Sequence, residues 1–532
     1  MAELNRRTVL VASALAATGG MVALDGCSVM RTGKGVVFLP APEVANLAPV
    51  APREFRAAWI ASVANIDWPS RKGLSTAQQQ AEMRAMLDRA VALRLNAIIL
   101  QVRTSADALY SSDLEPWSEY LTGTQGQAPS PFYDPLALWI EEAHARGLEL
   151  HAWFNPFRAR QSRAASSLAG SHVGKTHPEW VKSYGDQLWI DPGEPAAAQH
   201  SLAVFMDVLR RYDVDGIHID DYFYPYPITE VDNPKVEVDF PDQPAWQRYL
   251  ETGGTLTRGD WRRSHVDALI ERIYRGIRQT KPWVRFGISP FGLGRPELRP
   301  PGVTGFSQYH KLYANVERWL SEGWLDYLVP QLYWPIDSKG QPFEPLLNYW
   351  HTRNTHARHV WAGLYTSRVS AQEVSTQSGG QPREIVNQIS AVRKRAPDSG
   401  HVHFSMVALM DGRQNLGQIL GLETYIGHAV IPATRWLRAD PVAPFEARLT
   451  AGPQGYYWLD FQVENAAVVP MRWVVWLRYG AQWELVTSGS KRLDLVARSA
   501  TGDWLNACVV SALDRVGNET PRLGYSVEPV VI

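Results

Sequence analysis

The feature that most constrains the fold is a series of short apolar segments that recur along most of the chain. Eight such segments, separated by amphipathic stretches, begin near Phe55, Asn96, Leu148, Val214, Val284, Leu325, Val360 and His401. This alternation is typical of βα units around a parallel sheet. Between the fourth and fifth segments, apolar residues from Val266 to Ile277 repeat at helical spacing and stop before Pro282. Eight units predict a closed (β/α)₈ barrel over residues 53–434.

A doubly wound open sheet is the competing α/β topology, but no glycine-rich phosphate turn follows the first strand. The pattern changes in residues 435–532, where segments such as 457–461 and 473–477 alternate between apolar and polar residues. Alternation with intervening turn residues predicts a small β-sandwich. Residues 510–519 resemble the final hairpin of fibronectin type III-like domains. We expect this module either to pack and space the chain or to bind carbohydrate.

The first 27 residues carry the features of an export signal. Arg6 and Arg7 form a twin-arginine-like start, an apolar stretch runs to Leu24, and residues 24–27 resemble a bacterial lipobox ending at Cys27. We expect Cys27 to carry the lipid, with an uncleaved membrane anchor as the alternative. Ser28 resembles an outer-membrane sorting signal, so we expect a lipid-anchored protein of the cell envelope, on the inner leaflet of the outer membrane facing the periplasm. Residues 28–52 lack periodicity and predict a tether.

The composition excludes some partners and suggests another. In the 532 residues, 53 Lys and Arg balance 54 Asp and Glu, which leaves no basic field to attract nucleic acid. Hydrophobic residues make up 45% and charged residues 20%, as expected of a folded body. The 21 Trp and 21 Tyr suit a groove in which sugar rings stack on flat side chains. We expect a glycan substrate, no metal or other cofactor and no nucleic-acid partner; the oligomeric state stays open.

Polar residues collect where the predicted strands end, which is the functional face of such barrels. The side chains expected to bind substrate there are Asn65, Asp67, Trp68, Gln101, Arg103, Asp107, His151, Trp153, Asn155, His218, Tyr222, Ser289, Gln331, Tyr333 and Trp334. Because side chains on a strand alternate, His151, Trp153 and Asn155 should share one face. The histidines could instead be satisfied core residues, and the aromatic residues could be rim packing.

Asp220 and Asp221, at the end of the fourth segment, are the predicted catalytic centre. Asp220 shares a face with His218, and Asp221 reaches the same cleft if the strand ends there. Two adjacent carboxylates raise each other's pKa and place a proton donor beside an acceptor, which glycoside hydrolysis requires. Alternatively, one of the pair caps a helix or pairs with Arg103.

These segments together resemble the glycosyl-hydrolase-like 10 family. The similarity is carried by residues 59–69, 101–103, 152–156, 215–225, 287–292 and 330–334. That family consists of bacterial, often lipid-anchored barrel proteins and includes a division-associated hydrolase of denuded peptidoglycan glycan strands. The resemblance therefore implies a glycoside hydrolase that acts on N-acetylhexosamine strands lacking stem peptides.

Two mechanisms remain open. Adjacent acids after strand four resemble those of barrels in which the acetamido oxygen of the sugar attacks, so that Asp220 would orient that group and Asp221 would act as general acid and base. In the variant, Asp220 is a covalent nucleophile, and its acid partner is one of Asp67, Asp107, Glu297 and Asp337. Long connections over residues 222–261 and 292–316 are expected to wall a groove, with Arg295 placed to meet a lactyl carboxylate or simply solvated.

Two other functions compete with hydrolysis. A metal-dependent deacetylase could use His151, His218 and Asp220, although the paired histidine spacings that usually announce a zinc site are missing. A glycan-binding lipoprotein that keeps the barrel without turnover is the non-enzymatic alternative.

Overall fold

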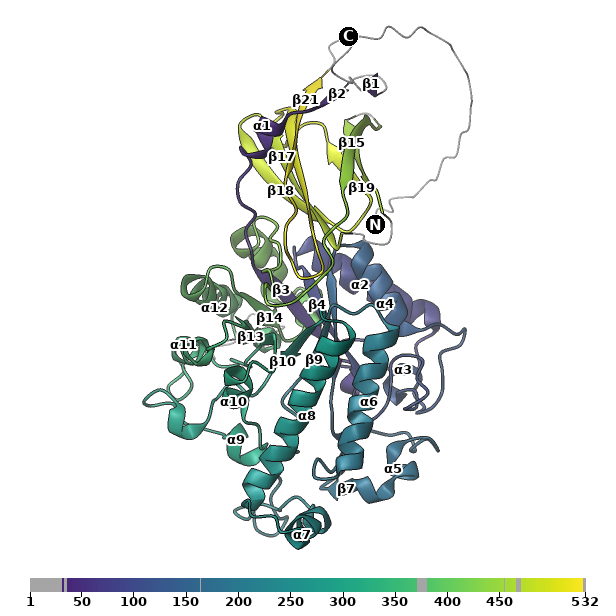
Figure 1. Ribbon diagram of the computed structural model, residues 1–532, viewed down its shortest axis with the longest axis vertical. Helices are drawn as coiled ribbons and strands as arrows, with labels where there is room; N and C mark the ends of the chain where they lie inside the picture. Colours follow the sequence, from purple (N-terminus) through teal and green to yellow (C-terminus); the bar gives the residue numbers. More distant parts are fainter. Residues whose placement is uncertain are drawn as a thin grey trace.

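A β-sandwich packed on one end of a parallel barrel makes up the computed structural model of the chain (Figure 1). The structure describes residues 31–32, 36–162, 164–370, 380–453, 455–465 and 470–529. The predicted signal peptide, with Cys27 and the membrane-anchor alternative, lies outside these residues. Within them, no helix combines the length and apolar character needed to cross a membrane.

The barrel sheet contains all eight strands that the apolar segments predict. Its strands are β3 (Phe55–Ile60), β4 (Ala97–Arg103), β5 (Glu149–Phe154), β9 (Gly216–Ile219), β10 (Arg285–Ile288), β11 (Tyr327–Leu328), β12 (His359–Val360), β13 (Ala362–Leu364) and β14 (Gly400–His403). Strands β12 and β13 are halves of one interrupted strand, which pairs with β11 on one side and β14 on the other. Since β14 also pairs with β3, the parallel sheet closes into the predicted barrel.

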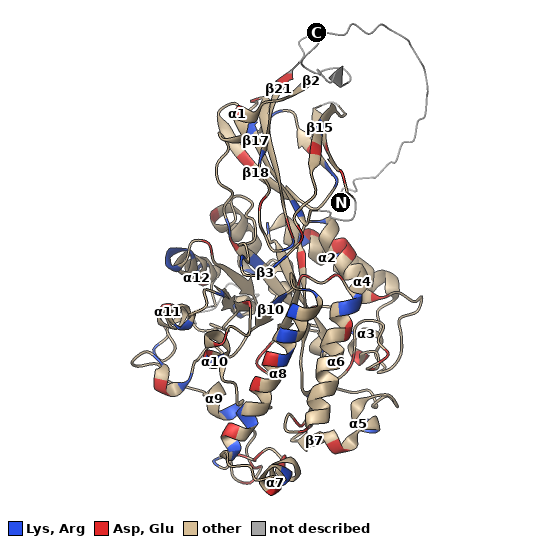
Figure 2. Cartoon of the chain, in the orientation of Figure 1, with Lys and Arg blue, Asp and Glu red and all other residues tan. Residues whose placement is uncertain are grey.

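Helices follow each strand and cover the outside of the barrel (Figure 1). The helices that alternate with the strands are α2 (Thr76–Ala92), α4 (Pro135–Ala145), α6 (Pro195–Arg211), α8 (Arg258–Thr280), α10 (Val316–Ser321), α11 (Phe343–Arg353), α12 (Pro382–Arg395), α13 (Met406–Met410) and α14 (Leu416–Ile419). Helix α8 contains the predicted periodic segment 266–277. Residues of both charge signs lie along its outer side (Figure 2), as expected for a solvent-facing helix.

The loops at the carboxyl ends of the strands contain further short elements. These are α3 (Glu119–Thr122), β6 (Arg158–Arg160), α5 (Val173–Thr176), β7 (Val181–Tyr184), β8 (Gln187–Ile190), α7 (Gln243–Glu251) and α9 (Gln308–Lys311). Strands β6, β8 and β7 form a small antiparallel sheet after β5. This sheet fixes the chain immediately beyond the end of β5, where functional side chains are expected.

Alternate residues of each barrel strand enter two different cores. Ile98 and Leu100 pack outward against the helices, whereas Ala97 and Ile99 point into the barrel. The inner core also contains large aromatic side chains such as Trp59. The period of two therefore decides which side chains can reach the mouth of the barrel.

The second body is the small sandwich expected from the tail. Its first sheet consists of β1 (Arg31–Thr32), β2 (Val36–Pro40), β21 (Leu523–Pro529), β20 (Leu505–Leu513), β17 (Arg472–Tyr479) and β18 (Gln482–Ser488). Its second sheet consists of β15 (Phe445–Ala451), β16 (Tyr456–Val463) and β19 (Arg492–Val496). Strand β2 corrects the prediction of a tether over residues 28–52, because it pairs antiparallel with β21, and helix α1 (Pro42–Ala45) follows it. The physical reason is the open edge of β21, whose backbone groups an extended segment can satisfy.

The sandwich contacts the amino-terminal end of the barrel strands. Arg472 donates a hydrogen bond of 3.0 Å to the backbone oxygen of Asn96, just before β4, and Arg515 forms an ion pair of 2.5 Å with Asp213, before β9. Cys508 is a free, buried cysteine within the sandwich. The sandwich therefore lies at the end of the barrel away from the carboxyl ends of the strands (Figure 1).

Candidate active site

A cavity of about 340 Å³ opens at the carboxyl ends of the barrel strands. Its lining consists of Trp59, Ala61, Val63, Ile66, Gln101, Trp153, Arg158, Asp220, Asp221, Tyr222, Tyr226, Ser289, Gln331, Tyr333, Tyr365 and Phe404. A larger cavity of about 500 Å³ lies between the other end of the barrel and the sandwich, and it contains none of the predicted site residues. The chemistry expected from the sequence therefore belongs to the smaller cavity.

Asp220 is the first residue after β9 and is held by donors from the end of β5. The side-chain amide of Asn155 donates to both carboxyl oxygens, at 2.8 and 2.7 Å. The indole nitrogen of Trp153 donates at 3.1 Å. Burial, together with the charge of Asp221, raises the pKa of Asp220 to about 7. Trp153 and Asn155 share a strand face, as the period of two predicts.

Asp221 also faces the cavity, because β9 ends at Ile219 and the chain turns away from the sheet. The hydroxyl of Tyr226 hydrogen-bonds to its carboxyl group. Burial raises the pKa of Asp221, while the bonds from Tyr226 and Gln331 oppose that rise. With both pKa values raised by burial, the pair retains a proton toward neutral pH and can act as an acid and a base.

A buried arginine lines the same cavity as the two carboxyl groups. Arg158 begins β6, lines the cavity and is only 4% exposed. Its guanidinium donates to the backbone oxygen of Thr104 at 3.0 Å and to the side-chain oxygen of Asn155 at 2.5 Å, and it stacks 4.6 Å from the ring centre of Tyr222. The positive charge favours the ionised forms of Asp220 and Asp221.

Aromatic rings form the walls. Tyr333 and Tyr365 stack with ring centres 5.1 Å apart, and Phe404 lies edge-on to Trp59 at 6.1 Å. Flat apolar faces beside carboxyl and amide groups are the combination that binds sugar rings, whose faces are apolar and whose rims are polar.

Most of the sequence that forms this site matches a known protein family. Residues 54–378 match the sequence profile of the family described as Glycosyl hydrolase-like 10, which is more than half of the chain. This chain belongs to the glycosyl hydrolase-like 10 family. The resemblance stated from the motifs is thereby confirmed, and with it the expectation of a glycoside hydrolase.

Two curated relatives and a solved structure give the extent of the similarity. The chain is 38% identical to glycosyl hydrolase YngK of Bacillus subtilis (strain 168) over 422 residues, which are 78% of this chain and 80% of that protein. It is 32% identical to glycosyl hydrolase DigH of Escherichia coli (strain K12) over 314 residues, 56% of this chain and 69% of the other. The PgaB (BpsB) glycoside hydrolase domain of Bordetella bronchiseptica aligns with a TM-score of 0.46 and 12% identity, covering 71% of this chain and 99% of that domain.

In this glycosyl hydrolase-like 10 member, about half of the residues predicted from strand ends reach the cavity. Those that line it are Gln101, Trp153, Asp220, Asp221, Tyr222, Ser289, Gln331 and Tyr333. Asn155 lies directly behind them, where it supports Asp220 and accepts a bond of 2.8 Å from Gln101.

Residues predicted after strand one have structural positions instead, which corrects the sequence-based assignment. Asp67 accepts hydrogen bonds from the Ser405 hydroxyl and from the backbone amides of Ala61, just after β3, and of Val407 in α13. Its buried carboxyl does not line the cavity. Trp68 is fully buried and donates to a backbone oxygen of α2. Asn65 donates to the backbone oxygen of Pro69, in its own loop, and to that of Tyr120 in α3. Their side-chain polar groups bond to the protein, and none of the three residues lines the cavity.

The same correction applies after strand two. Arg103 is fully buried and makes two hydrogen bonds to Glu115, at 2.7 and 2.5 Å. Arg103 therefore pairs with Glu115 and not with an acid of the predicted pair. Asp107 accepts from two backbone amides and from the Thr104 hydroxyl, which closes the turn.

The remaining predictions also fall outside the cavity lining. His151 and His218 lie inside the barrel, beneath the cavity floor. Trp334 packs against Phe291 and lines a small neighbouring pocket. Arg295 is paired with Glu297 in a solvent-exposed loop, so the cation that faces the cavity is Arg158 and not Arg295.

Five functional positions were missed by the strand-end rule. Trp59 lies within β3 and not at its end. Arg158 follows the Asn155 motif by three residues, and this proximity was the available signal. Tyr226, Tyr365 and Phe404 lie in the loops that follow β9, β13 and β14. Tyr226 also stacks on Phe306, so the two predicted long connections meet at the cavity wall.

Proposed function

We propose that this protein hydrolyses the glycosidic bonds of N-acetylhexosamine-containing peptidoglycan strands that lack stem peptides. The observation that carries the proposal is the pair Asp220 and Asp221, both buried and both lining one aromatic-walled cavity at the barrel mouth. Family membership supports glycan hydrolysis, and the family resemblance supports the denuded strand as substrate.

The partners of the two carboxyls assign their roles. Asp220 accepts three N–H hydrogen bonds from Asn155 and Trp153, which favours its ionised form. The hydroxyl of Tyr226, by contrast, can accept a hydrogen bond as well as donate one, so Asp221 can hold a proton beside it. The pair holds one proton between its two carboxyls, and we assign the role of general acid to Asp221 and that of orienting the substrate to Asp220.

The lining favours attack by the acetamido group of the sugar over attack by the protein. Among the described residues that line the cavity, Asp220 and Asp221 alone carry carboxyl groups. Asp67, Asp107, Glu297 and Asp337, the acid partners that a covalent mechanism on Asp220 would need, do not belong to this lining. A retaining pair would require its second carboxyl across the scissile bond.

In the proposed reaction, the acetamido oxygen attacks the anomeric carbon while the bond to the leaving oxygen breaks. Asp221 gives its proton to that oxygen, and Asp220 stabilises the positive charge of the resulting oxazolinium ring. Water then attacks the anomeric carbon, the bond from that carbon to the acetamido oxygen breaks, and Asp221 takes a proton from the water. Each step uses a group that lines the cavity.

Product analysis tests the proposal. A soluble form comprising residues 28–532 is incubated with amidase-treated and with untreated sacculi, and released saccharides are identified by mass spectrometry. We expect release from the stripped material only, with Asp220→Asn and Asp221→Asn inactive. Binding without release would favour the non-catalytic lipoprotein, and equal release from both materials would remove the preference for stripped strands.

A thiazoline analogue of the acetamido intermediate separates the two mechanisms. Tight competitive inhibition is expected for substrate assistance. A glycosyl ester trapped on Asp220 and found by peptide mass spectrometry would overturn it.

The geometry disfavours a deacetylase. The proposed ligands His151 and His218 use their ring nitrogens in hydrogen bonds inside the barrel, and neither lines the cavity. Activity of chelator-treated protein, with metal analysis, checks this alternative.

We also propose that the protein is a lipid-anchored envelope protein, modified at Cys27 and facing the periplasm from the outer membrane. The lipobox-like residues 24–27 support this location. The acylated residue should be detected by mass spectrometry of the mature amino terminus, and Cys27→Ala should release the protein from the membrane fraction.

A further inference from the structure

A chain of buried polar side chains runs through the barrel beneath the proposed catalytic cavity. Its members, from the sandwich end toward the cavity, are Arg285, Glu149, His151, Tyr327, His218 and Trp59. We call this set the axial chain. All six side chains are at most 5% exposed, in a place where such barrels usually hold branched apolar residues.

The proton positions along the axial chain follow from Trp59. An indole nitrogen can only donate, and Trp59 lies 3.1 Å from Nε2 of His218. That nitrogen therefore carries no hydrogen, so the neutral ring of His218 carries its hydrogen on Nδ1. Burial lowers the pKa of His218 well below its usual value, which keeps the ring neutral.

The same reasoning continues toward the sandwich end. Nδ1 of His218 lies 3.1 Å from the hydroxyl of Tyr327 and donates to its oxygen. The hydrogen of Tyr327 is then directed to Nδ1 of His151, 2.7 Å away. His151 consequently carries its hydrogen on Nε2 and donates it to Glu149 at 3.1 Å. One donor-only group at the cavity thus determines the direction of every bond to the far end.

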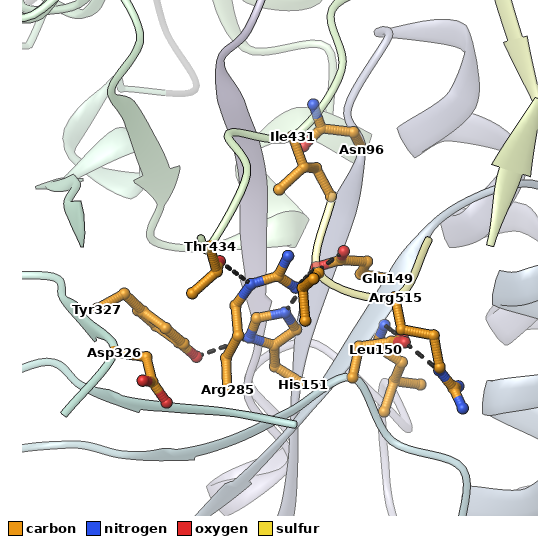
Figure 3. A network of polar contacts seen from close by, with 12 residues as sticks. Asn96, Glu149, Leu150, His151, Arg285, Asp326, Tyr327, Ile431, Thr434 and Arg515 are labelled. Atoms are coloured by element: carbon orange, nitrogen blue, oxygen red, sulfur yellow. Dashed lines mark hydrogen bonds and ion pairs between the residues drawn. The ribbon is translucent and has the colours of Figure 1, made fainter. Parts of the chain in front are cut away.

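An ion pair anchors that far end (Figure 3). Arg285 donates to both oxygens of Glu149, at 2.9 and 2.8 Å, and to the hydroxyl of Thr434 at 2.7 Å. Thr434 belongs to the segment that joins the barrel to the sandwich.

Two glycines make room for the axial chain. A Cβ atom at Gly216 would lie 2.4 Å from Nδ1 of His151, and one at Gly287 would lie 1.8 Å from the ring of Tyr327. Gly216 and Gly287 stand two residues before His218 and Ser289, on adjacent strands. The backbone is therefore shaped around these rings.

We propose that the axial chain is a positioning device that holds Trp59 and Ser289 at the cavity floor for sugar binding, through one enforced arrangement of protons. Both residues line the cavity, and the Ser289 hydroxyl lies 3.0 Å from the same Nε2 of His218 that Trp59 contacts. Tyr327 and the two histidines are positioning residues, since they act through these two groups. The inference rests on the proposed function for the role of the floor, but not for the proton arrangement.

The proton arrangement can be measured without substrate. Histidine ring ¹⁵N labelling, with resonances assigned by His151→Asn and His218→Asn, reports which nitrogen carries the hydrogen. We expect Nδ1–H on His218 and Nε2–H on His151. Any other placement of the hydrogens on either ring would overturn the proposal.

Tyr327→Phe tests the positioning role. Removing the hydroxyl should raise KM for glycan about tenfold with kcat within about twofold, because the floor contributes to binding. It should also shift the NMR resonance of the Trp59 indole N–H, which is assigned with Trp59→Phe. The matched control is Tyr425→Phe, whose hydroxyl also bridges two buried histidines, His401 and His403, but whose chain ends at Thr366 outside the cavity lining.

Equal KM changes in the two variants, or an unmoved indole signal in Tyr327→Phe, would contradict the positioning role. If the unmodified protein released no sugar, the proposed function would fail. The histidine tautomers and the Trp59 indole resonance would then still test the proton arrangement proposed for the axial chain.

Discussion

The side-chain amide of Asn155 spans both carboxyl oxygens of Asp220, at 2.8 and 2.7 Å. An amide that reaches both oxygens fixes the rotation of the carboxyl group and favours its negative charge. Asn155→Asp replaces this donor with a like charge. We expect kcat to fall about 100-fold, as for the loss of one preorganised donor, in assays of saccharide release. Asn348→Asp, the same exchange on the exposed face of α11, should leave kcat unchanged; a similar loss there would refute the assignment.

The proton on Asp221 is needed only when the leaving group is a poor one. Asp221→Asn should lower kcat on glycan strands about 1000-fold, because no proton reaches the leaving sugar oxygen. An N-acetylhexosamine glycoside with a dinitrophenolate leaving group needs no such proton and should lose less than about tenfold. Equal losses on both substrates would show that Asp221 is not the acid. Circular dichroism of the variant checks that the barrel is intact.

The acid pair also predicts a pH dependence. Burial and the charge of Asp221 raise the pKa of Asp220 to about 7, and burial also raises the pKa of Asp221. The reaction needs one proton on the pair, so kcat should fall as pH rises above about 7 and the pair loses that proton. A flat profile from pH 6 to pH 9 would contradict this.

Removing the buried cation should shift that profile. Arg158 lowers the pKa values of Asp220 and Asp221, so Arg158→Leu should raise them and move the alkaline limb of kcat to higher pH. The matched control is Arg160→Leu on the same strand, because Arg160 does not line the cavity and should leave the limb in place. A shift toward lower pH in Arg158→Leu would be the wrong sign for this electrostatic role.

A stability measurement tests how tightly the barrel is built around Tyr327. Gly287→Ala places a methyl group 1.8 Å from the Tyr327 ring and should lower the free energy of unfolding by about 3 kcal/mol, the cost of overpacking a core. Gly421→Ala has open space around its Cβ and should have little effect. Denaturant titration of both variants gives the comparison. Similar stabilities would mean that the barrel interior adjusts freely.

Most of the barrel could be predicted from the sequence, because its strands and helices are indicated by local patterns of apolar residues. Eight apolar segments marked eight barrel strands, and the residues from Val266 to Ile277 marked helix α8. The acid pair was also readable, since Asp220 and Asp221 follow directly on a strand whose carboxyl end faces the barrel mouth. Strand β2 was missed because its partner, β21, lies almost at the other end of the chain.

The site was only partly predictable for a similar reason. Asp67 and Arg103 follow predicted strands, so the sequence predicted them beside Asp220. In the structure Asp67 accepts a hydrogen bond from Ser405 and Arg103 pairs with Glu115, and no local sequence pattern indicates these partners. Tyr365 and Phe404 entered the cavity without being expected.

The order of strands and helices and the alternation of side chains could be predicted from the sequence, because they depend on spacing along the chain. The family could be predicted from its motifs. Which polar groups remain available to a substrate is known only from the folded arrangement. Trp59 and His218, 159 positions apart, meet only when the barrel closes. Whether a polar group faces a ligand or a neighbour depends on such distant contacts, since burial requires each donor to find an acceptor wherever the fold provides one.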